Sequence, residues 1–411
     1  MENGSSACAQ ILRMARSPVR EAQNAFEGFS PANRATLGSA CIGGAVYYPL
    51  RSRPVIASTA AMFCCIWSYL ILRWIVFAYT FEKSLLDAED LAEEDSIFDI
   101  VDGIKVHFRK TLPVEQSPAQ STEGTVLYHG FGASLFSFRD VQRELADALG
   151  MTTVSFDFPG FGLTQRPSGG FSNYSLRRTA RVGNELSRQQ GFEKVVLVGH
   201  SMGAFAACMA AVMEPERIRA LVLISPAVPV GDARVRQMSK NCLIRNMMRL
   251  IAGFRSIVLH ILWYFFFPLL VAFARSKVSK NDFWRSGLEY AAYDKKKITP
   301  KVVDGYSKPT NAKAWDWGVI SFIWGQMGAP FSSRGYLDRY FYDEIAERGI
   351  PTLVIHGEND RVVPIRIGEN VSKRISSSRF VSIRCCGHLP QEEEPQQVVE
   401  EVRSFLAESC V

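Results

Sequence analysis

One serine of this chain lies in a setting that few folds can provide. Ser201 is the middle residue of Gly199-His-Ser-Met-Gly203, which joins the apolar run KVVLVG to the small-residue run MGAFAACMAA. The first run predicts a buried strand and the second a closely packed helix. A sharp strand-to-helix turn strains the backbone at its central residue and demands tiny flanking residues. The pattern therefore predicts a nucleophile elbow that presents Ser201 at the end of a strand.

A serine hydroxyl becomes an effective nucleophile only when a base removes its proton. Of the six histidines, His388 is the best placed, because its segment RCCGHLP follows the last predicted strand. His107 lies on an early hairpin, and His356 ends a strand, where we expect a structural role. His388 is therefore the predicted base.

An imidazole base needs a carboxylate to fix its tautomer and stabilise its cation. The segment HGENDRVVP, just beyond the penultimate predicted strand, offers Glu358 and Asp360. We favour Asp360 because it lies deeper in the loop, and Glu358 is the alternative.

The tetrahedral intermediate of such chemistry needs two N–H donors. One is predicted to be the amide of Met202, the residue after the nucleophile. The other is Phe131 in the segment HGFGAS, because Gly130 and Gly132 let its amide point inward; an ordinary glycine-rich turn is the alternative. The later segment DFPGFG (157–162) predicts a structural turn rather than a chemical role.

From about residue 96, short apolar strands alternate with helical patterns. Asp102-Gly103 predicts the turn of an opening hairpin. The remaining strands are predicted at 125–129, 152–157, 194–199, 220–225, 352–357 and 379–384, and helices follow near 136–149, 174–190, 202–213, 365–376 and 395–407. Continuous apolar strands that alternate with helices predict an α/β fold, with a mostly parallel eight-stranded sheet and helices on both faces.

One long stretch breaks this rhythm. Residues 227–345 are helical in character and lie between two predicted strands of the sheet. We therefore expect a cap that is inserted over the carboxyl edge of the sheet, where ligands bind in open α/β sheets. The expected organisation is a flexible segment 1–35, a membrane-anchor region 36–95, a first core half 96–226, the cap 227–345 and a second core half 346–411.

Composition excludes several classes. Hydrophobic residues make up 47% and charged residues 21%, which argues against extensive disorder. The net charge of +6 is modest, and no basic stripe interleaved with aromatics predicts nucleic-acid binding. The nine cysteines show neither a disulfide framework nor metal-site spacing. We expect no cofactor and no metal, and the pattern predicts no particular oligomeric state.

An apolar segment near the N-terminus predicts membrane attachment. Residues 55–79 are almost uncharged apart from Arg73 and are long enough to span a bilayer, although a buried helix is the alternative. A second span at 36–50 is a weaker alternative. Arg51 and Arg53 would leave the N-terminus cytosolic if there is one span, whereas a hairpin or an organelle membrane would overturn this orientation. The endoplasmic reticulum and the chloroplast are the alternatives for the membrane concerned.

A second apolar segment, residues 257–274, lies inside the cap. A span there would separate Ser201 from Asp360 across the bilayer, so we reject it. The segment is either a membrane-dipping surface or tunnel wall, or the hydrophobic core of the cap.

The motifs HGFGAS, DFPGFG, GHSMG, GENDRVVP and CGHLPQEEEP, in this order, resemble the α/β-hydrolase superfamily of the AB hydrolase-1 type. The chain resembles more closely the membrane-anchored plant and algal α/β hydrolases, on HGFGASLFSFRDV, YDKKKITPKVVDGYSKPTNAKAWDW and CGHLPQEEEP. The resemblance implies a Ser, Asp, His triad in that chain order. Epoxide hydrolases and haloalkane dehalogenases are similar in outline but carry Asp at the nucleophile, and Ser201 argues against both.

These observations predict a serine hydrolase for carboxylic esters of small apolar molecules or lipids, associated with a membrane. Acyl transfer and C–C bond hydrolysis could use the same triad. A non-catalytic ligand receptor on the same fold is the alternative from another class.

Overall fold

The computed structural model describes residues 62, 65–69, 85–114, 122–168, 170–227, 258, 267, 269–328 and 341–408. The chain divides into two compact units, Met1–Ser84 and Leu85–Val411. In the first unit only residue 62 and residues 65–69 are described, and they are helical.

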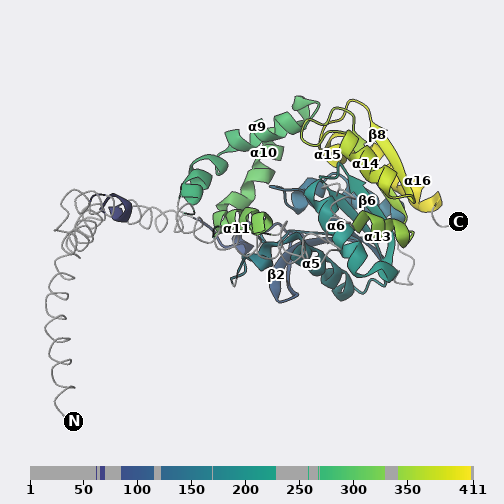
Figure 1. The fold of residues 1–411 in the computed structure, drawn as a ribbon, viewed down its shortest axis with the longest axis horizontal. Helices are drawn as coiled ribbons and strands as arrows, with labels where there is room; N and C mark the ends of the chain where they lie inside the picture. Colours follow the sequence, from purple (N-terminus) through teal and green to yellow (C-terminus); the bar gives the residue numbers. More distant parts are fainter. Residues whose placement is uncertain are drawn as a thin grey trace, which may run out of the picture. The chain divides into compact units, whose positions relative to one another are not determined.

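A single eight-stranded sheet forms the centre of the second unit (Figure 1). Its strands are β1 (Ile97–Val101), β2 (Ile104–Thr111), β3 (Glu123–Tyr128), β4 (Thr152–Phe156), β5 (Lys194–His200), β6 (Ile218–Ile224), β7 (Thr352–Gly357) and β8 (Ser378–Ile383). Their order is β1-β2-β4-β3-β5-β6-β7-β8. The strands from β4 to β8 pair in parallel, whereas β2 pairs antiparallel with both β1 and β4. Asp102 and Gly103 both have positive φ and form the tight turn of the β1–β2 hairpin.

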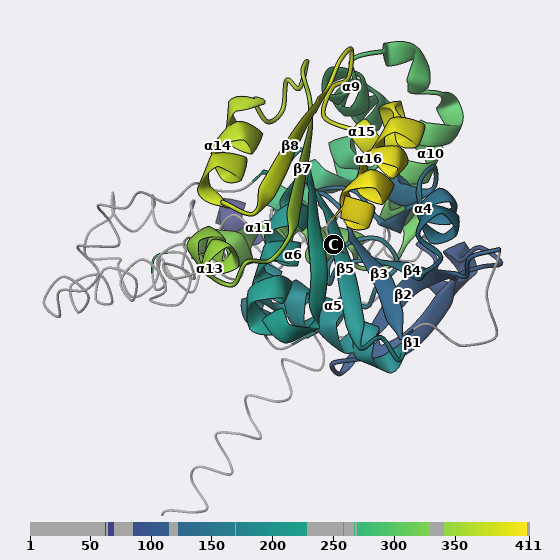
Figure 2. The ribbon, with the colours of Figure 1, turned by 90° about the vertical axis from the view of Figure 1, so that its right-hand side faces the viewer.

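Helices cover both faces of this sheet (Figure 2). One face carries α5 (Leu176–Gln189), α6 (Met202–Met213), α13 (Phe341–Glu347) and α14 (Arg366–Arg374), and the other carries α4 (Gln142–Leu149) and α16 (Pro395–Glu408). Alternate residues of β5 enter the two cores, as the pleat of a strand requires: Leu197 packs with the first set of helices and Val198 with the second. The predicted fold class is confirmed.

The predicted cap contains α9 (Asn281–Ala291), α10 (Pro300–Ser307) and α11 (Trp315–Gly328), which lie between β6 and β7 in the chain. The cap packs on the loops at the carboxyl ends of the strands. A Cβ on Gly160, in the loop after β4, would lie 2.8 Å from the carbonyl oxygen of Gly318 in α11. The two backbones can approach this closely only because both residues lack side chains.

Shorter helical segments complete the described chain. They are η2 (Glu89–Leu91), η3 (Leu135–Phe138), η4 (Phe171–Tyr174), η5 (Pro215–Arg217), the π-helical turn η6 (Ala274–Val278), η7 (Lys295–Lys297), η8 (Lys308–Asn311) and α15 (Pro390–Glu393).

The N-terminal membrane predictions fall mostly outside the described residues. The predicted flexible segment 1–35 and the weaker span at 36–50 lie wholly outside them, and the predicted span at 55–79 is described only at residues 62 and 65–69. Within the part of the chain that the structure describes, no helix is both long enough and apolar enough to cross a bilayer.

The apolar segment 257–274 is described only at 258, 267 and 269–274. Its helical part has two different faces. Val271 and Ala274 are buried, whereas Leu269 is 57% and Phe273 58% exposed. Part of the segment therefore packs within the cap, and part of it presents large apolar side chains at the surface.

Candidate active site

Ser201 sits on a strained turn between β5 and α6. Its backbone has φ 52° and ψ −116°, a region that residues with a side chain rarely occupy. A Cβ on Gly199 would lie 2.5 Å from the Cα of Ala204, and one on Gly203 would overlap the carbonyl oxygen of Tyr128. The two glycines are therefore required by the close passage of β5, α6 and the loop after β3.

The structure brings the three predicted residues Ser201, Asp360 and His388 together in one hydrogen-bonded chain. The Nε2 atom of His388 lies 3.0 Å from the Ser201 Oγ atom. The Nδ1 atom of His388 lies 2.7 Å from the Asp360 Oδ2 atom. In this arrangement Nδ1 carries the proton that it donates to the carboxylate, which leaves Nε2 free to accept the serine proton.

Asp360 is held by several donors, which separates it from its rival Glu358. Its Oδ1 atom accepts hydrogen bonds of 2.8 Å from the backbone N–H groups of Val362 and Val363. Burial alone would raise the pKa of Asp360, but hydrogen bonds from His356, His388 and the backbone keep it well below its ordinary value. Glu358 is exposed and lies 3.2 Å from the Ser382 hydroxyl, so it does not face His388.

The predicted oxyanion donors belong to two segments that adjoin Ser201. Met202 is the first residue of α6, where a backbone N–H has no acceptor within the helix. Phe131 follows β3 in a loop that presses on the elbow, because a Cβ on Gly130 would lie 3.3 Å from the Ser201 Cβ atom. Gly132 has φ 71°, which lets this loop turn back over the site.

Three buried side chains that sequence reasoning did not assign hold these loops. His129 donates from Nδ1 to the Gly130 carbonyl oxygen (2.7 Å) and accepts from the Phe158 N–H (3.0 Å). Burial lowers the pKa of His129 to about 4, so the ring is neutral and its two bonds keep these roles near pH 7.

The other two buried side chains hold the loop that carries His388. His200 lies 2.8 Å from the His388 carbonyl oxygen, and burial lowers its pKa to about 3. Glu393 accepts hydrogen bonds from the Gly387 and Leu389 N–H groups at 2.9 and 3.3 Å. In the sequence, the only signal for these roles is that His200 lies inside the GHSMG motif and Glu393 inside the CGHLPQEEEP motif. The motifs do not reveal the contacts themselves, because each side chain bonds to a backbone group of a loop.

A cavity of about 450 Å³ opens above Ser201 and His388. Its walls come from the loops after β3 and β4 and from the cap helices α9, α10 and α11. The side chains that line it are mostly apolar, including Phe131, Phe161, Trp284, Leu288, Val319 and Ile323. Arg166 is the one lysine or arginine that lines it among the described residues. The space suits an apolar ligand that reaches Ser201 from beneath the cap.

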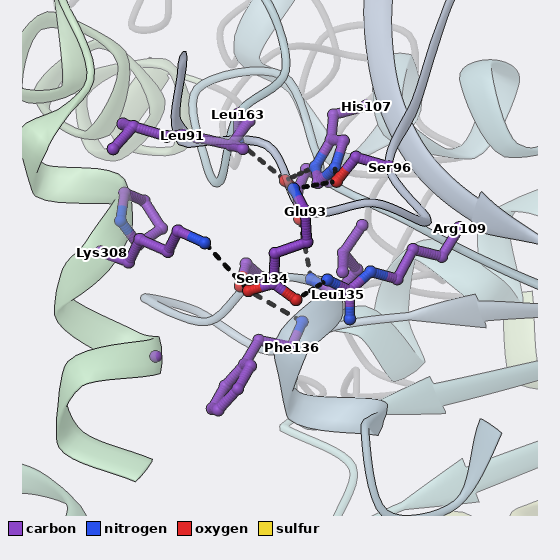
Figure 3. Close-up of a pocket in the computed structure, with 13 residues that line it drawn as sticks. Leu91, Glu93, Ser96, His107, Arg109, Ser134, Leu135, Phe136, Leu163 and Lys308 are labelled. Atoms are coloured by element: carbon purple, nitrogen blue, oxygen red, sulfur yellow. Dashed lines mark hydrogen bonds and ion pairs between the residues drawn. The ribbon is translucent and has the colours of Figure 1, made fainter. Parts of the chain in front are cut away.

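A second serine, histidine and aspartate trio lies elsewhere in the same unit, and Figure 3 labels its serine and its histidine, Ser96 and His107. The His107 Nε2 atom is 2.9 Å from the Ser96 Oγ atom, and the His107 Nδ1 atom is 2.7 Å from the Asp157 Oδ2 atom. The adjoining cavity measures only about 30 Å³. Figure 3 shows Lys308 pointing toward Glu93 at its edge, where the two form an ion pair of 2.9 Å.

The family model described as alpha/beta hydrolase fold matches residues 126–395, which is more than half of the chain. The chain belongs to the α/β-hydrolase family. The match includes the elbow at Ser201, the loop of Asp360 and the loop of His388 of this hydrolase.

Individual relatives agree with this assignment. The hydrolase is 28% identical over 306 residues to the uncharacterised hydrolase YugF of Bacillus subtilis, a match that covers 74% of this chain and 96% of YugF. It is 27% identical over 290 residues to putative esterase/lipase 2 of Mycoplasma pneumoniae, covering 70% of this chain and 91% of the relative.

Among solved structures, a meta-cleavage product hydrolase from Pseudomonas fluorescens IP01 matches with a TM-score of 0.54 at 18% identity, covering 76% of this chain and 98% of the other. This likeness shows the fold alone. Because these relatives are bacterial, they lend no support to a closer kinship of this hydrolase with plant and algal membrane-anchored enzymes, which stays a prediction.

Proposed function

We propose that this chain is a serine hydrolase that cleaves carboxylic esters through an acyl-enzyme. The single observation that carries the proposal is the bonded chain from Ser201 through His388 to Asp360, placed on a strained elbow at the floor of an apolar cavity. This arrangement supports acyl transfer, which needs a nucleophile, a base, an orienting carboxylate and N–H donors beside the attacked carbon.

The proposed first half-reaction forms the acyl-enzyme. The Ser201 Oγ atom attacks the carbonyl carbon while the His388 Nε2 atom takes the hydroxyl proton, and the Asp360 carboxylate stabilises the imidazolium. The N–H groups of Phe131 and Met202 hold the negative oxygen of the tetrahedral intermediate. When this intermediate collapses, the alkoxide leaves with the proton from His388.

The second half-reaction returns the free enzyme. His388 takes a proton from water as the water oxygen attacks the acyl carbon of the Ser201 ester. Collapse of the second tetrahedral intermediate breaks the bond to Oγ, releases the acid and returns the proton to Ser201. No cofactor or metal is needed for either step.

The substrate we propose is an apolar or lipid ester taken from a membrane. The apolar lining of the cavity supports this, and so do the exposed Leu269 and Phe273 on the cap. The apolar sequence 55–79 supports a membrane anchor before the hydrolase unit, in the endoplasmic reticulum or the chloroplast membrane.

The test of this function is a fluorophosphonate probe together with a lipid extract. We expect the full-length protein to be labelled at Ser201 and to release fatty acid from at least one lipid ester. We expect Ser201→Ala to lose labelling and to lower the rate by roughly 10⁴-fold or more. Equal labelling of wild type and Ser201→Ala would rule out this nucleophile. Product analysis with added alcohol separates hydrolysis from acyl transfer.

A further inference from the structure

Arg166 places a positive charge in the wall of the cavity that contains Ser201. It lies in the loop between β4 and η4, and its two terminal nitrogens donate to the carbonyl oxygens of Thr164 (2.7 Å) and Gly162 (2.6 Å). Its aliphatic part packs under the cap, since its Cγ atom would lie 2.9 Å from a Cβ on Gly318 of α11. The guanidinium is thus fixed between the sheet loops and the cap.

Among the residues that the structure describes, this charge has no counterion of its own. The carboxylates that act on it through space are Asp157 and Asp316, and each is bonded to another cationic or ionisable group, Asp157 to His107 and Asp316 to Arg275. The Arg166 Nε atom has no hydrogen-bond partner in the described part of the chain. Burial lowers the pKa of Arg166 to about 10, so the side chain is still charged near pH 7.

A cation that is removed from water without a partner is unfavourable, and an anion beside it relieves this cost. Arginine has five N–H donors in a planar fork that suits carboxylate and phosphate groups. A neutral lipid ester would fill the apolar part of the cavity but leave the guanidinium uncompensated.

We propose that Arg166 binds an anionic group, a carboxylate or a phosphate, on the ester that Ser201 attacks. The proposal rests on the proposed function and deepens it, because it narrows the substrate to amphipathic esters. The apolar body of such an ester lies against Phe161, Trp284 and Ile323 while its anion meets the guanidinium.

Two matched pairs of esters test the proposal in the full-length protein. The first pair is mono-4-nitrophenyl suberate, which carries a carboxylate, and its neutral methyl ester. The second is the lysophosphatidic acid and the monoacylglycerol that carry the same oleoyl chain. We expect wild type to favour the anionic member of at least one pair, and the pair that responds identifies the anion.

The decisive variant is Arg166→Gln. We expect it to lower kcat/KM for the favoured anionic ester roughly ten- to hundredfold while the neutral ester changes less than about threefold. Arg166→Lys should restore part of the preference, because it keeps the charge without the planar fork. Arg217→Gln is the matched control, because Arg217 also donates to backbone carbonyls but does not line the cavity. It should leave the ratio of kcat/KM for the anionic ester to kcat/KM for the neutral ester unchanged.

A binding measurement keeps the proposal independent of turnover. In Ser201→Ala, the tryptophans Trp284 and Trp315 that line the cavity report occupancy by fluorescence. We expect the oleoyl lysophosphatidic acid to bind at least about tenfold more tightly than the monoacylglycerol, and Arg166→Gln to remove the difference.

The outcomes separate the two proposals. If the two lipids bind equally and the rates are equal within both ester pairs, the proposed role of Arg166 is wrong. The proposed hydrolase function would not be affected by that result. A loss that is equal for anionic and neutral esters in Arg166→Gln would show that Arg166 only supports its loop. Tight, Arg166-dependent binding without any turnover would instead overturn the proposed hydrolysis and leave the anion site standing.

Discussion

Two trios of serine, histidine and aspartate share one pattern of bonded atoms in this molecule. Ser201, His388 and Asp360 are joined by distances of 3.0 and 2.7 Å. Ser96, His107 and Asp157 are joined through the corresponding atoms by 2.9 and 2.7 Å. Hydrogen-bond geometry alone therefore does not separate a candidate active site from a structural cluster.

The surroundings of the two serines differ in every respect that matters for chemistry. Ser201 lies on a strained elbow at the start of α6, below a cavity of about 450 Å³. Ser96 follows η2 in a turn, its oxygen accepts a hydrogen bond of 2.9 Å from the Glu93 N–H, and the adjoining cavity of about 30 Å³ has room for little more than a water molecule. The cavity beside Ser201 has room for a carbonyl substrate, whereas the cavity beside Ser96 does not.

The carboxylates of Asp360 and Asp157 also have different roles. Asp360 receives backbone N–H groups from its own loop and orients the predicted base His388. Asp157 is 1% exposed and receives N–H groups from Leu135 and Leu163 at 2.7 Å, so it ties η3 and the loop after β4 to the sheet. The comparison predicts that damage to the first trio lowers activity and damage to the second lowers stability.

Asp360→Asn should have the largest effect on activity and so test this contrast most strongly. The amide still accepts from Val362 and Val363 but presents no carboxylate to His388, so the imidazole loses its tautomer and its counter-charge. We expect kcat to fall roughly 10³- to 10⁴-fold with little change in the unfolding midpoint. Steady-state kinetics on a 4-nitrophenyl ester measure this. Glu358→Gln is the control and should stay within about twofold; a larger loss there than at Asp360 would reverse the assignment.

The matching change in the second trio is Asp157→Asn. It removes a buried negative charge that two N–H groups and His107 share, so we expect the free energy of unfolding to fall by about 2–4 kcal/mol. The folded fraction should keep kcat within about threefold. Urea denaturation gives the first quantity and active-site titration the second. Asp90→Asn, at an exposed position, should change stability by less than about 0.5 kcal/mol.

Acid should reveal the same carboxylate in the wild type. Burial alone would raise the pKa of Asp157, but His107 and the Leu135 N–H lower it from 3.8 to about 2. As pH falls, the unfolded chain takes up the proton first, so the stabilisation is complete above about pH 4 and disappears as pH falls toward 2. The contribution of the Asp157 carboxylate to the free energy of unfolding is roughly 2 kcal/mol. Urea midpoints between pH 5 and 2 should fall more steeply in wild type than in Asp157→Asn; parallel curves would contradict the lowered pKa.

Local pattern predicted much of this arrangement. The strand and helix around Ser201 were readable because a strained turn between a buried strand and a packed helix requires Gly199 and Gly203. The preference for Asp360 over Glu358 also came from position in one loop, and the structure places only Asp360 against His388.

Contacts between distant segments were not readable in the same way. His107 meets Asp157 because β2 pairs antiparallel with β4 in one register, and no short-range pattern fixes that pairing. The sequence places His107 only on a hairpin and predicts only a structural turn for the DFPGFG segment. The Arg166 guanidinium shows the same limit, since its place in the cavity depends on α11 packing over the loop after β4.

The smallest effect should come from Ser96→Ala. Ser96 is only partly buried, and its hydroxyl links His107 to the Glu93 N–H, so we expect the free energy of unfolding to change by less than about 1 kcal/mol. Ester hydrolysis should stay within about twofold of wild type, because the cavity beside this oxygen is too small to hold an ester. The sharper measurement is fluorophosphonate labelling of Ser201→Ala, which should be absent at every serine. If Ser201→Ala is labelled and the double variant with Ser96→Ala is not, the second trio is reactive. Cavity size would then no longer distinguish the two sites.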